Sequence, residues 1–271
     1  MPPDLLVLLV SLVAGAFGSM VGIGGGLIVV PVLTTVLGYD ITDVVPASLL
    51  GVIAVSVGAA GPFLDAGTVD RPLAIRLLVA TAAGGLTGGL IAAILDGRTL
   101  AALFALLLVY VALQMARGAR SRATSAGADD PARHARSYVE PVTKRRIGYT
   151  PRRLPAGGAA SYLAGNVSGL LGVGGGVINV PVMTLVMDVP MRVATTTSTF
   201  MLGATAAASA IVYEAHGRLD PMLAAPVVLG VFAGAKVGAR ISKRIPPAWL
   251  RVAFVAIAGW FAVQMTLRAL G

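Results

Sequence analysis

The chain has 271 residues, of which 56% are hydrophobic and only 12% are charged, whereas soluble domains carry roughly 25% charged residues. This composition excludes an ordinary soluble protein and predicts an integral membrane protein. The absence of cysteine excludes disulfides and thiolate metal sites. The net charge of +9 comes mainly from residues 117–153 and 236–251. Basic loops beside membrane spans are typical of cytoplasmic segments, so we expect no binding to nucleic acid.

The first element is an apolar run over residues 5–37. No basic residue precedes it, so we expect a membrane element and not a cleaved signal. A straight helix of this length would be about 50 Å long, which exceeds the ~30 Å hydrocarbon core of a bilayer. The run contains Gly22-Ile23-Gly24-Gly25-Gly26 and then Pro31, and each glycine costs a helix roughly 1 kcal/mol relative to alanine. The run must therefore tilt strongly, break or fold back, and the glycines favour a break.

The rest of the chain repeats this plan after a polar interruption. Residues 118–155 are basic and rich in proline, which predicts a mobile cytoplasmic linker. The linker separates a first membrane repeat, residues 1–117, from a second, residues 156–271. The expected membrane elements, in chain order, are 5–37, 44–63, 72–95, 98–117, 157–187, 193–213, 222–241 and 249–269. The predicted fold is an all-α polytopic membrane protein of two tandem repeats with about four helical elements each.

The two repeats match at one constant offset. The run Gly172-Val173-Gly174-Gly175-Gly176 with Pro181 corresponds to the first glycine run with Pro31. At the same offset Ser48 corresponds to Ser198 and Asp70 to Asp220. Chance similarity between apolar segments would not keep one register across polar loops, so we infer a tandem duplication.

Charge favours an inverted orientation of the two repeats. If the linker lies in the cytoplasm, four full crossings in the second repeat would place Arg240, Lys243 and Arg251 outside, against the positive-inside rule. If the glycine-broken segment turns back without crossing, these residues return to the cytoplasm. An odd number of crossings per repeat follows, and with it an inverted repeat.

The glycine breaks are the candidate substrate site. In transporters with inverted repeats, broken helices meet near the midplane and their N-termini face anionic groups, because the first amides of a helix lack internal partners and carry partial positive charge. Helices that begin near Leu27 and Val177 would aim their amides at the breaks. The candidate substrate-binding glycines are Gly22, Gly24, Gly25, Gly26, Gly172, Gly174, Gly175 and Gly176, with Pro31 and Pro181 as hinges. The alternative is that the glycines only bring helices together.

Polar residues inside the expected spans complete the candidate site. Thr196, Thr197 and Ser198 could donate hydrogen bonds to an oxyanion, although back-bonding to their own helix is an equal alternative. Ser48 is the counterpart of Ser198, and Asn179 follows the second glycine run. Lys236 lies within a span, but about one turn from Arg240, so it could instead reach the membrane interface. We expect no catalytic residues, no metal site and no cofactor.

The paired Gly-x-Gly-Gly-Gly motifs, each followed by a proline, together with Ala83-Gly84-x3-Gly88 and its copy, resemble the TauE/SafE family of sulfite and organosulfonate exporters. The resemblance covers both repeats without the linker. It implies a secondary carrier for sulfite, sulfonates or related sulfur-containing or carboxylate anions. It also implies a multi-pass location in the cytoplasmic (inner) membrane of a prokaryote, and it carries the motif glycines, Pro31 and Pro181 over as functional residues. The first repeat lacks the hydroxyl run of 195–199.

The predicted function is therefore transport of a small anion by alternating access. A passive anion channel is the first alternative, and a membrane-embedded enzyme is a weaker one because no nucleophile–base pair is evident. The expected partners are the anion, a coupling proton or sodium ion, membrane lipid and a second copy of the chain in a homo-oligomer.

Overall fold

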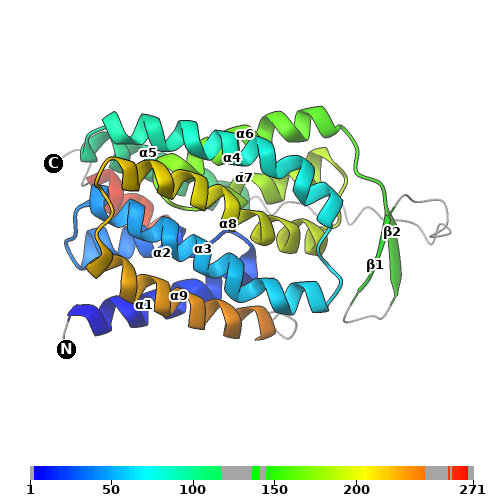
Figure 1. Cartoon of the computed structure of the whole chain (residues 1–271), viewed down its shortest axis with the longest axis horizontal. Helices are drawn as coiled ribbons and strands as arrows, with labels where there is room; N and C mark the ends of the chain where they lie inside the picture. The colour runs from blue at the N-terminus through cyan, green and yellow to red at the C-terminus, as the bar shows by residue number, and fades with distance from the viewer. Residues whose placement is uncertain (1–2, 117–135, 141–144, 242–255, 257, 268–271) are drawn as a thin grey trace.

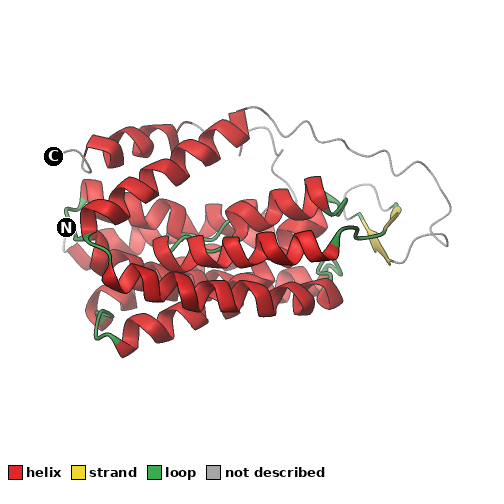
Figure 2. Cartoon of the chain, turned by 90° about the horizontal axis from the view of Figure 1, so that it is seen from above, coloured by secondary structure: helices red, strands yellow, loops and turns green. Residues whose placement is uncertain are grey.

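The computed structural model describes residues 3–116, 136–140, 145–241, 256 and 258–267 of the chain. Within these residues the fold is a bundle of long helices, with a two-stranded ribbon beyond one end (Figures 1 and 2). The predicted all-α membrane fold is confirmed. Among the described residues, four helices, α1, α3, α4 and α9, are long and apolar enough to cross a membrane.

The two halves contain the same elements in the same order. The first half comprises α1 (Pro3–Val21), α2 (Gly26–Pro31), the π-helix η1 (Val32–Val36), α3 (Ile41–Asp65), α4 (Arg71–Ile94) and α5 (Gly97–Ala116). The second comprises α6 (Leu154–Leu171), α7 (Gly176–Pro181), the π-helix η3 (Val182–Val186), α8 (Met191–Ala215) and α9 (Pro221–Ile241). Residues 258–267 are also helical. Each predicted apolar run thus contains a helix, and both glycine-broken runs contain two α-helices and a π-helix.

Acidic residues fix where two long helices begin. Asp40 precedes α3 and accepts a hydrogen bond of 2.9 Å from the Thr42 amide. Asp70 precedes α4 and accepts one of 3.0 Å from the Leu73 amide. Such caps satisfy an amide that has no partner inside the helix. The sequence analysis placed both starts within three residues but did not identify the caps.

The helices of one half pack mainly on those of the other. α1 packs along α9, and the equivalent α6 packs along α4. Both contacts rest on glycine: a Cβ at Gly230 would lie 2.8 Å from the Ser11 Cβ, and one at Gly88 would lie 2.8 Å from the Asn166 Cα. Glycines in these helices therefore serve close backbone packing.

The equivalent helices α3 and α8 run in opposite directions. The Thr196 hydroxyl, near the start of α8, donates a hydrogen bond of 2.7 Å to the Thr68 carbonyl after the end of α3. At the other end, Asp43 near the start of α3 interacts electrostatically with Asp220 and Arg218 after the end of α8. The Figure 1 view agrees, with α3 and α8 crossing the bundle in opposite senses. This is the geometry that an inverted repeat requires.

The second glycine-broken segment returns to the end from which it starts. The Arg152 amide, just before α6, donates a hydrogen bond of 3.0 Å to the Met187 carbonyl, just after η3. The expected fold-back is therefore present in this half, and the segment makes no net crossing of the bundle.

Part of the expected mobile linker is ordered. Strands β1 (Arg136–Val139) and β2 (Arg146–Tyr149) form an antiparallel ribbon in which Arg136 pairs with Tyr149. Tyr138 and Tyr149 are buried and pack edge to face, with ring centroids 6.4 Å apart. The expectation of a mobile linker is wrong for these strands, because one face of the ribbon is apolar enough to pack against the bundle. Residues 118–135 and 141–144 lie outside the described residues.

Candidate functional site

The two glycine runs form buried turns at which α1 and α6 end. Gly22 and Gly24 have φ angles of +80° and +90°, and Gly172 and Gly174 have φ angles of +67° and +77°. This left-handed region is accessible to glycine without the steric cost that a Cβ brings. Glycine is therefore needed at these four positions for the chain to reverse, as the sequence analysis expected of the breaks.

The two breaks lie directly against each other. A Cβ on Gly26 would overlap the Gly172 carbonyl oxygen, and a Cβ on Gly176 would overlap the Gly22 carbonyl oxygen. Gly24 lies equally close to the second break, since its Cβ would be 2.8 Å from the Val173 carbonyl oxygen. The contacts are reciprocal, so each half presents the same surface to the other. The breaks, although far apart in the sequence, form one centre.

A helix leaves this centre in each half. In α2 the first hydrogen bonds run from the Ile28 and Val29 amides to the Gly25 carbonyl, at 3.1 and 3.0 Å. In α7 the amides of Ile178 and Asn179 make the same bonds to Gly175. The amides before these turns have no helical acceptor. Two helix starts, each with partial positive charge, therefore adjoin the same point.

The two proposed hinge prolines lie where each of these helices changes its winding. Pro31 ends α2 and is followed by η1, and Pro181 ends α7 and is followed by η3. Proline lacks an amide proton and displaces the carbonyl of the preceding turn, which accounts for the local shift to π-helix. Irregular helical turns of this kind are common at functional sites.

The equivalent residues Ser48 and Ser198 differ in their hydrogen bonds. The Ser48 hydroxyl on α3 donates a hydrogen bond of 2.8 Å to the Gly172 carbonyl, and so ties α3 to the second break. Ser198 is fully buried, yet its hydroxyl has no hydrogen-bond partner among the described residues. The residue of α8 that lies beside the first break is Thr195. Its carbonyl oxygen is 3.0 Å from the position that a Cβ on Gly22 would occupy.

Asn179 is the most unusual polar group near the centre. The residue is 2% exposed, and its Oδ1 atom has no partner among the described residues. Its Nδ2 atom lies 3.3 Å from the position of a Gly175 Cβ, so the side chain lies beside the second break. An unpaired buried carbonyl costs about 1–3 kcal/mol. The equivalent residue in the first half is Val29.

Thr196 and Thr197 bond to a different part of the molecule. Their partners lie in the α3–α4 loop, residues 66–70. Thr196 donates to the Thr68 carbonyl at 2.7 Å and also back to the Arg192 carbonyl at 3.0 Å. The Thr197 hydroxyl accepts from the Asp70 amide at 3.0 Å. The back-bonding alternative is therefore present for Thr196, whereas donation to an oxyanion stays a prediction. The recorded bonds of these threonines join the start of α8 to the α3–α4 loop at one end of the bundle, and the preceding Thr195 contacts the first break.

A polar cluster at that same end was not predicted from the sequence. The buried Asp70 carboxylate forms an ion pair with Arg136, accepts a hydrogen bond of 2.9 Å from the Tyr149 hydroxyl, and caps α4. Burial, and secondly the Asp70 charge, raise the pKa of Tyr149. The sequence shows only that Arg136 and Tyr149 occur in this segment. No spacing in the sequence connects them to Asp70.

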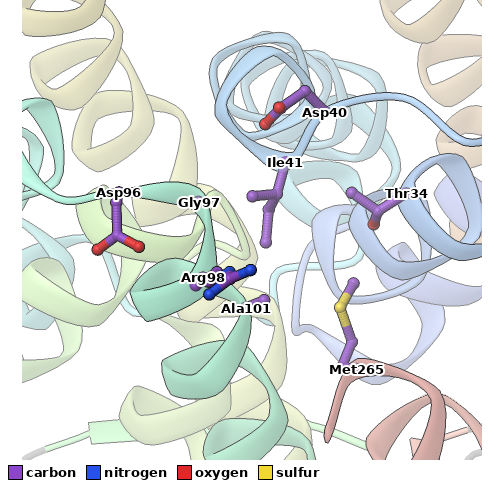
Figure 3. Close-up of a pocket in the computed structure, with 8 residues that line it drawn as sticks. All are labelled: Thr34, Asp40, Ile41, Asp96, Gly97, Arg98, Ala101 and Met265. Atoms are coloured by element: carbon purple, nitrogen blue, oxygen red, sulfur yellow. The ribbon is translucent and has the colours of Figure 1, made fainter. Parts of the chain in front are cut away.

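A cavity of about 350 Å³ lies at the opposite end, away from the breaks. Figure 3 shows Asp40, Asp96 and Arg98 around it, with Thr34 of η1 and Met265 on its far side. Both carboxylates bond to neighbouring residues, Asp40 to Thr42 and Asp96 to Thr99. The hydrogen bond from the Thr99 hydroxyl lowers the pKa of Asp96. Because negative charge exceeds positive charge here, we do not assign the anion site to this cavity.

Lys236 lies outside the centre. Lys236 is exposed on α9, consistent with a side chain that extends along the surface to the interface. Among the described residues, no three histidine, aspartate or glutamate side chains are placed to hold a metal ion.

The bundle of apolar helices with two buried glycine breaks that meet at one centre is that of a multi-pass membrane protein of transporter type. The model of the sulfite exporter TauE/SafE family matches residues 7–265, so the chain belongs to that family. It is 25% identical over 250 residues to the probable membrane transporter protein YunE of Bacillus subtilis, with 89% of each chain covered.

Two further relatives match the chain over almost the whole length of both proteins. The chain is 23% identical to the probable membrane transporter protein MJ0441 of Methanocaldococcus jannaschii, with 97% of this chain and 95% of the relative covered. It is 29% identical to a probable membrane transporter protein of Haemophilus influenzae, with 97% and 98% covered. No solved structure matches the chain significantly.

Proposed function

We propose that the protein is a secondary transporter that moves a small anion, such as sulfite, a sulfonate or a related organic anion, across the cytoplasmic membrane of a prokaryote by alternating access. The observation that carries this proposal is the reciprocal contact of the two glycine breaks, from which α2 and α7 begin. An anion there would meet backbone amides and helix dipoles without any fixed cation. The family name, which refers to sulfite export, supports the substrate class.

The packing of the breaks suggests how such a site is reached. Gly22, Gly26, Gly172 and Gly176 are buried against each other, so the site is occluded in this conformation. Antiparallel α3 and α8, each adjoining one break, would move in opposite senses in an inverted repeat. Opening one end would then separate the breaks toward one side of the membrane, and opening the other end would separate them toward the opposite side. Pro31 and Pro181 would be the hinges.

Asn179 would make the proposed site asymmetric, because its side-chain amide has an acceptor at one atom and a donor at the other. Its unpaired Oδ1 accepts but cannot donate, while the amide nitrogen of the same side chain donates. An anion would use that nitrogen, and a coupling sodium ion would use the oxygen. Ser198, with its unpartnered hydroxyl, would be a second donor. These roles make Asn179 the most informative side chain to change.

Thermal unfolding of the detergent-purified protein with a panel of solutes tests the proposal. The panel is sulfite, thiosulfate, sulfoacetate, taurine, sulfate, lactate, sodium chloride and nickel chloride. A ligand at 100 times its dissociation constant stabilises the bound state by about 2.7 kcal/mol. We expect one of the anions to raise the melting temperature. Stabilisation by the cations alone would refute an anion site at the breaks.

Flux in proteoliposomes then separates the carrier from a passive channel. A carrier accumulates the stabilising anion against its gradient when a proton or sodium gradient is imposed, whereas a channel only dissipates the anion gradient. Chemical conversion of the anion during this assay would point instead to an enzyme.

A further inference from the structure

The ribbon in the middle of the chain contacts both halves of the bundle at one end. We use "hairpin" for residues 136–140 and 145–149, and "hairpin end" for the end of the bundle where it lies, which Figures 1 and 2 show from two directions. One face of the hairpin carries Tyr138, Ile147 and Tyr149, which pack in one apolar cluster with Leu73 of α4 and Met187. The hairpin is therefore part of the folded structure.

Its contact with the first half is centred on Asp70. The side chain of this residue is 1% exposed, and that of Arg136, its ion-pair partner, is 21% exposed. Arg136 and Tyr149 lie opposite each other in the ribbon register, so both donors reach the same carboxylate oxygen from adjacent strands. A buried carboxylate is costly without such partners. The hairpin thus supplies the partners that stabilise the buried charge of Asp70.

Its contact with the second half is centred on Glu140. This carboxylate forms an ion pair of 2.9 Å with Arg192 in the first turn of α8. Its other oxygen accepts a hydrogen bond of 2.9 Å from the Tyr138 hydroxyl. The side chains of Arg192 and Glu140 are 30% and 16% exposed, so the pair is partly shielded from water.

The two halves also touch each other directly beneath the hairpin. Thr196 bonds to the Thr68 carbonyl, and the Asp70 amide bonds to Thr197. Any opening of the bundle between the 66–70 loop and the start of α8 must break both bonds. The hairpin is held to the loop through Arg136 and to α8 through Glu140. The same opening must therefore also break one of these ion pairs.

We propose that the hairpin is a latch that holds the hairpin end of the transporter closed, and that this end opens only when the Glu140–Arg192 or Arg136–Asp70 pair separates. The proposal rests on the alternating access of the proposed function. It assigns the closing role to a segment between the repeats, while the glycine breaks keep the substrate role. Thr196 and Thr197 are then residues of the closed end, and the latch stabilises their bonds.

Accessibility of a buried cysteine tests the latch without any substrate. The chain has no cysteine, so Ser198→Cys introduces a single thiol at a fully buried position on α8 whose hydroxyl has no partner. Inside-out membrane vesicles are treated with a membrane-impermeant maleimide, and the labelling rate is measured. We expect slow labelling in the background and about fivefold faster labelling with Glu140→Gln or Arg192→Gln, the factor expected when a partly shielded ion pair is lost.

Two further variants make the result specific. The exchange of both charges, Glu140→Arg with Arg192→Glu, is expected to restore slow labelling. Arg152→Gln is the matched control, since Arg152 pairs with Asp188 at 3.9 Å and neither residue lies in the hairpin, the 66–70 loop or α8. The control is expected to leave the rate unchanged. Equal labelling in all variants, or faster labelling in the control as well, overturns the latch. Size-exclusion profiles exclude variants that do not fold.

A reversible crosslink provides the complementary test. Glu140→Cys with Arg192→Cys, oxidised in proteoliposomes, is expected to stop anion flux, and reduction is expected to restore it. Unchanged flux after complete crosslinking overturns the latch. If no anion is transported by any form of the protein, the proposed function fails while the labelling assay still decides whether the hairpin end opens.

Discussion

The contact between the glycine breaks makes a sharp prediction for Gly26→Ala. The new Cβ would overlap the Gly172 carbonyl oxygen and lie 2.9 Å from both the Gly172 carbonyl carbon and the Val173 Cα. Carbon atoms rest about 3.5 Å apart or further, so the breaks must separate by about 0.6 Å or more. All the atoms that would clash are backbone atoms, so no side-chain rotation relieves the overlap.

We expect this substitution to cost about 3 kcal/mol, the upper end of the range for overpacked cores. That cost lowers the melting temperature by roughly 6–12 °C if each kcal/mol lowers it by 2–4 °C, as in chains of comparable size. The assay is thermal unfolding in detergent, followed by fluorescence-detected size exclusion. Anion-dependent stabilisation is expected to disappear as well, because the helix starts of α2 and α7 no longer adjoin.

Gly25→Ala is the matched control, one residue away. Its Cβ would lie 3.6 Å from the nearest atoms, which belong to Ala14 and Gly15, and its φ angle of −70° suits alanine. We expect a change of no more than about 1 kcal/mol. If Gly25→Ala and Gly26→Ala lower the melting temperature equally, the breaks do not meet as described and the reasoning is refuted.

Three further predictions follow from single residues. Ser48→Ala removes the hydrogen bond to the Gly172 carbonyl and should cost about 1 kcal/mol, whereas Ser198→Ala removes an unpartnered hydroxyl; equal melting temperatures would contradict the difference. Asn179→Val removes an unpaired buried carbonyl and should leave the melting temperature unchanged or higher while it abolishes stabilisation by the anion. Retention of anion stabilisation would remove Asn179 from the site. Because the pKa of Tyr149 is raised above its ordinary value of 10.0, its contribution to stability is complete below pH 10 and is lost as the pH rises further; Tyr149→Phe should flatten this alkaline loss in a pH series of melting temperatures.

Features that follow from local composition could be predicted from the sequence. The apolar runs placed α3, α4, α8 and α9 within a few residues, because long apolar helices in a membrane protein have few alternatives. The duplicated glycine runs correctly indicated broken helices, since three adjacent glycines and a proline oppose a continuous helix. The fold-back could be predicted from the basic residues at 240–251 together with the basic linker, since four full crossings would have placed these two segments on opposite sides of the membrane.

Features that depend on tertiary contacts could not be predicted. Nothing in the sequence around Asp70 shows that it pairs with Arg136 and Tyr149, which lie far along the chain in a segment of polar composition. The same segment looked mobile because its apolar residues, Tyr138 and Tyr149, are few and acquire a partner only in the folded bundle. The unequal bonding of Ser48 and Ser198, which occupy equivalent positions, is likewise a property of packing. Whether the predicted substrate-binding residues bind an anion stays a prediction.

The hairpin also breaks the equivalence of the two ends of the molecule. Asp70 and Asp220 occupy matching places in the two halves, yet Asp70 is buried under the hairpin, whereas Asp220 is exposed and bonds to the Met222 amide. A carrier in which one end is held closed is open more often at the other end. The free energy that holds the first end closed sets the ratio of the two open populations. If the protein works by the proposed alternating access, the hairpin therefore gives the two otherwise equivalent ends unequal resting populations of the open state.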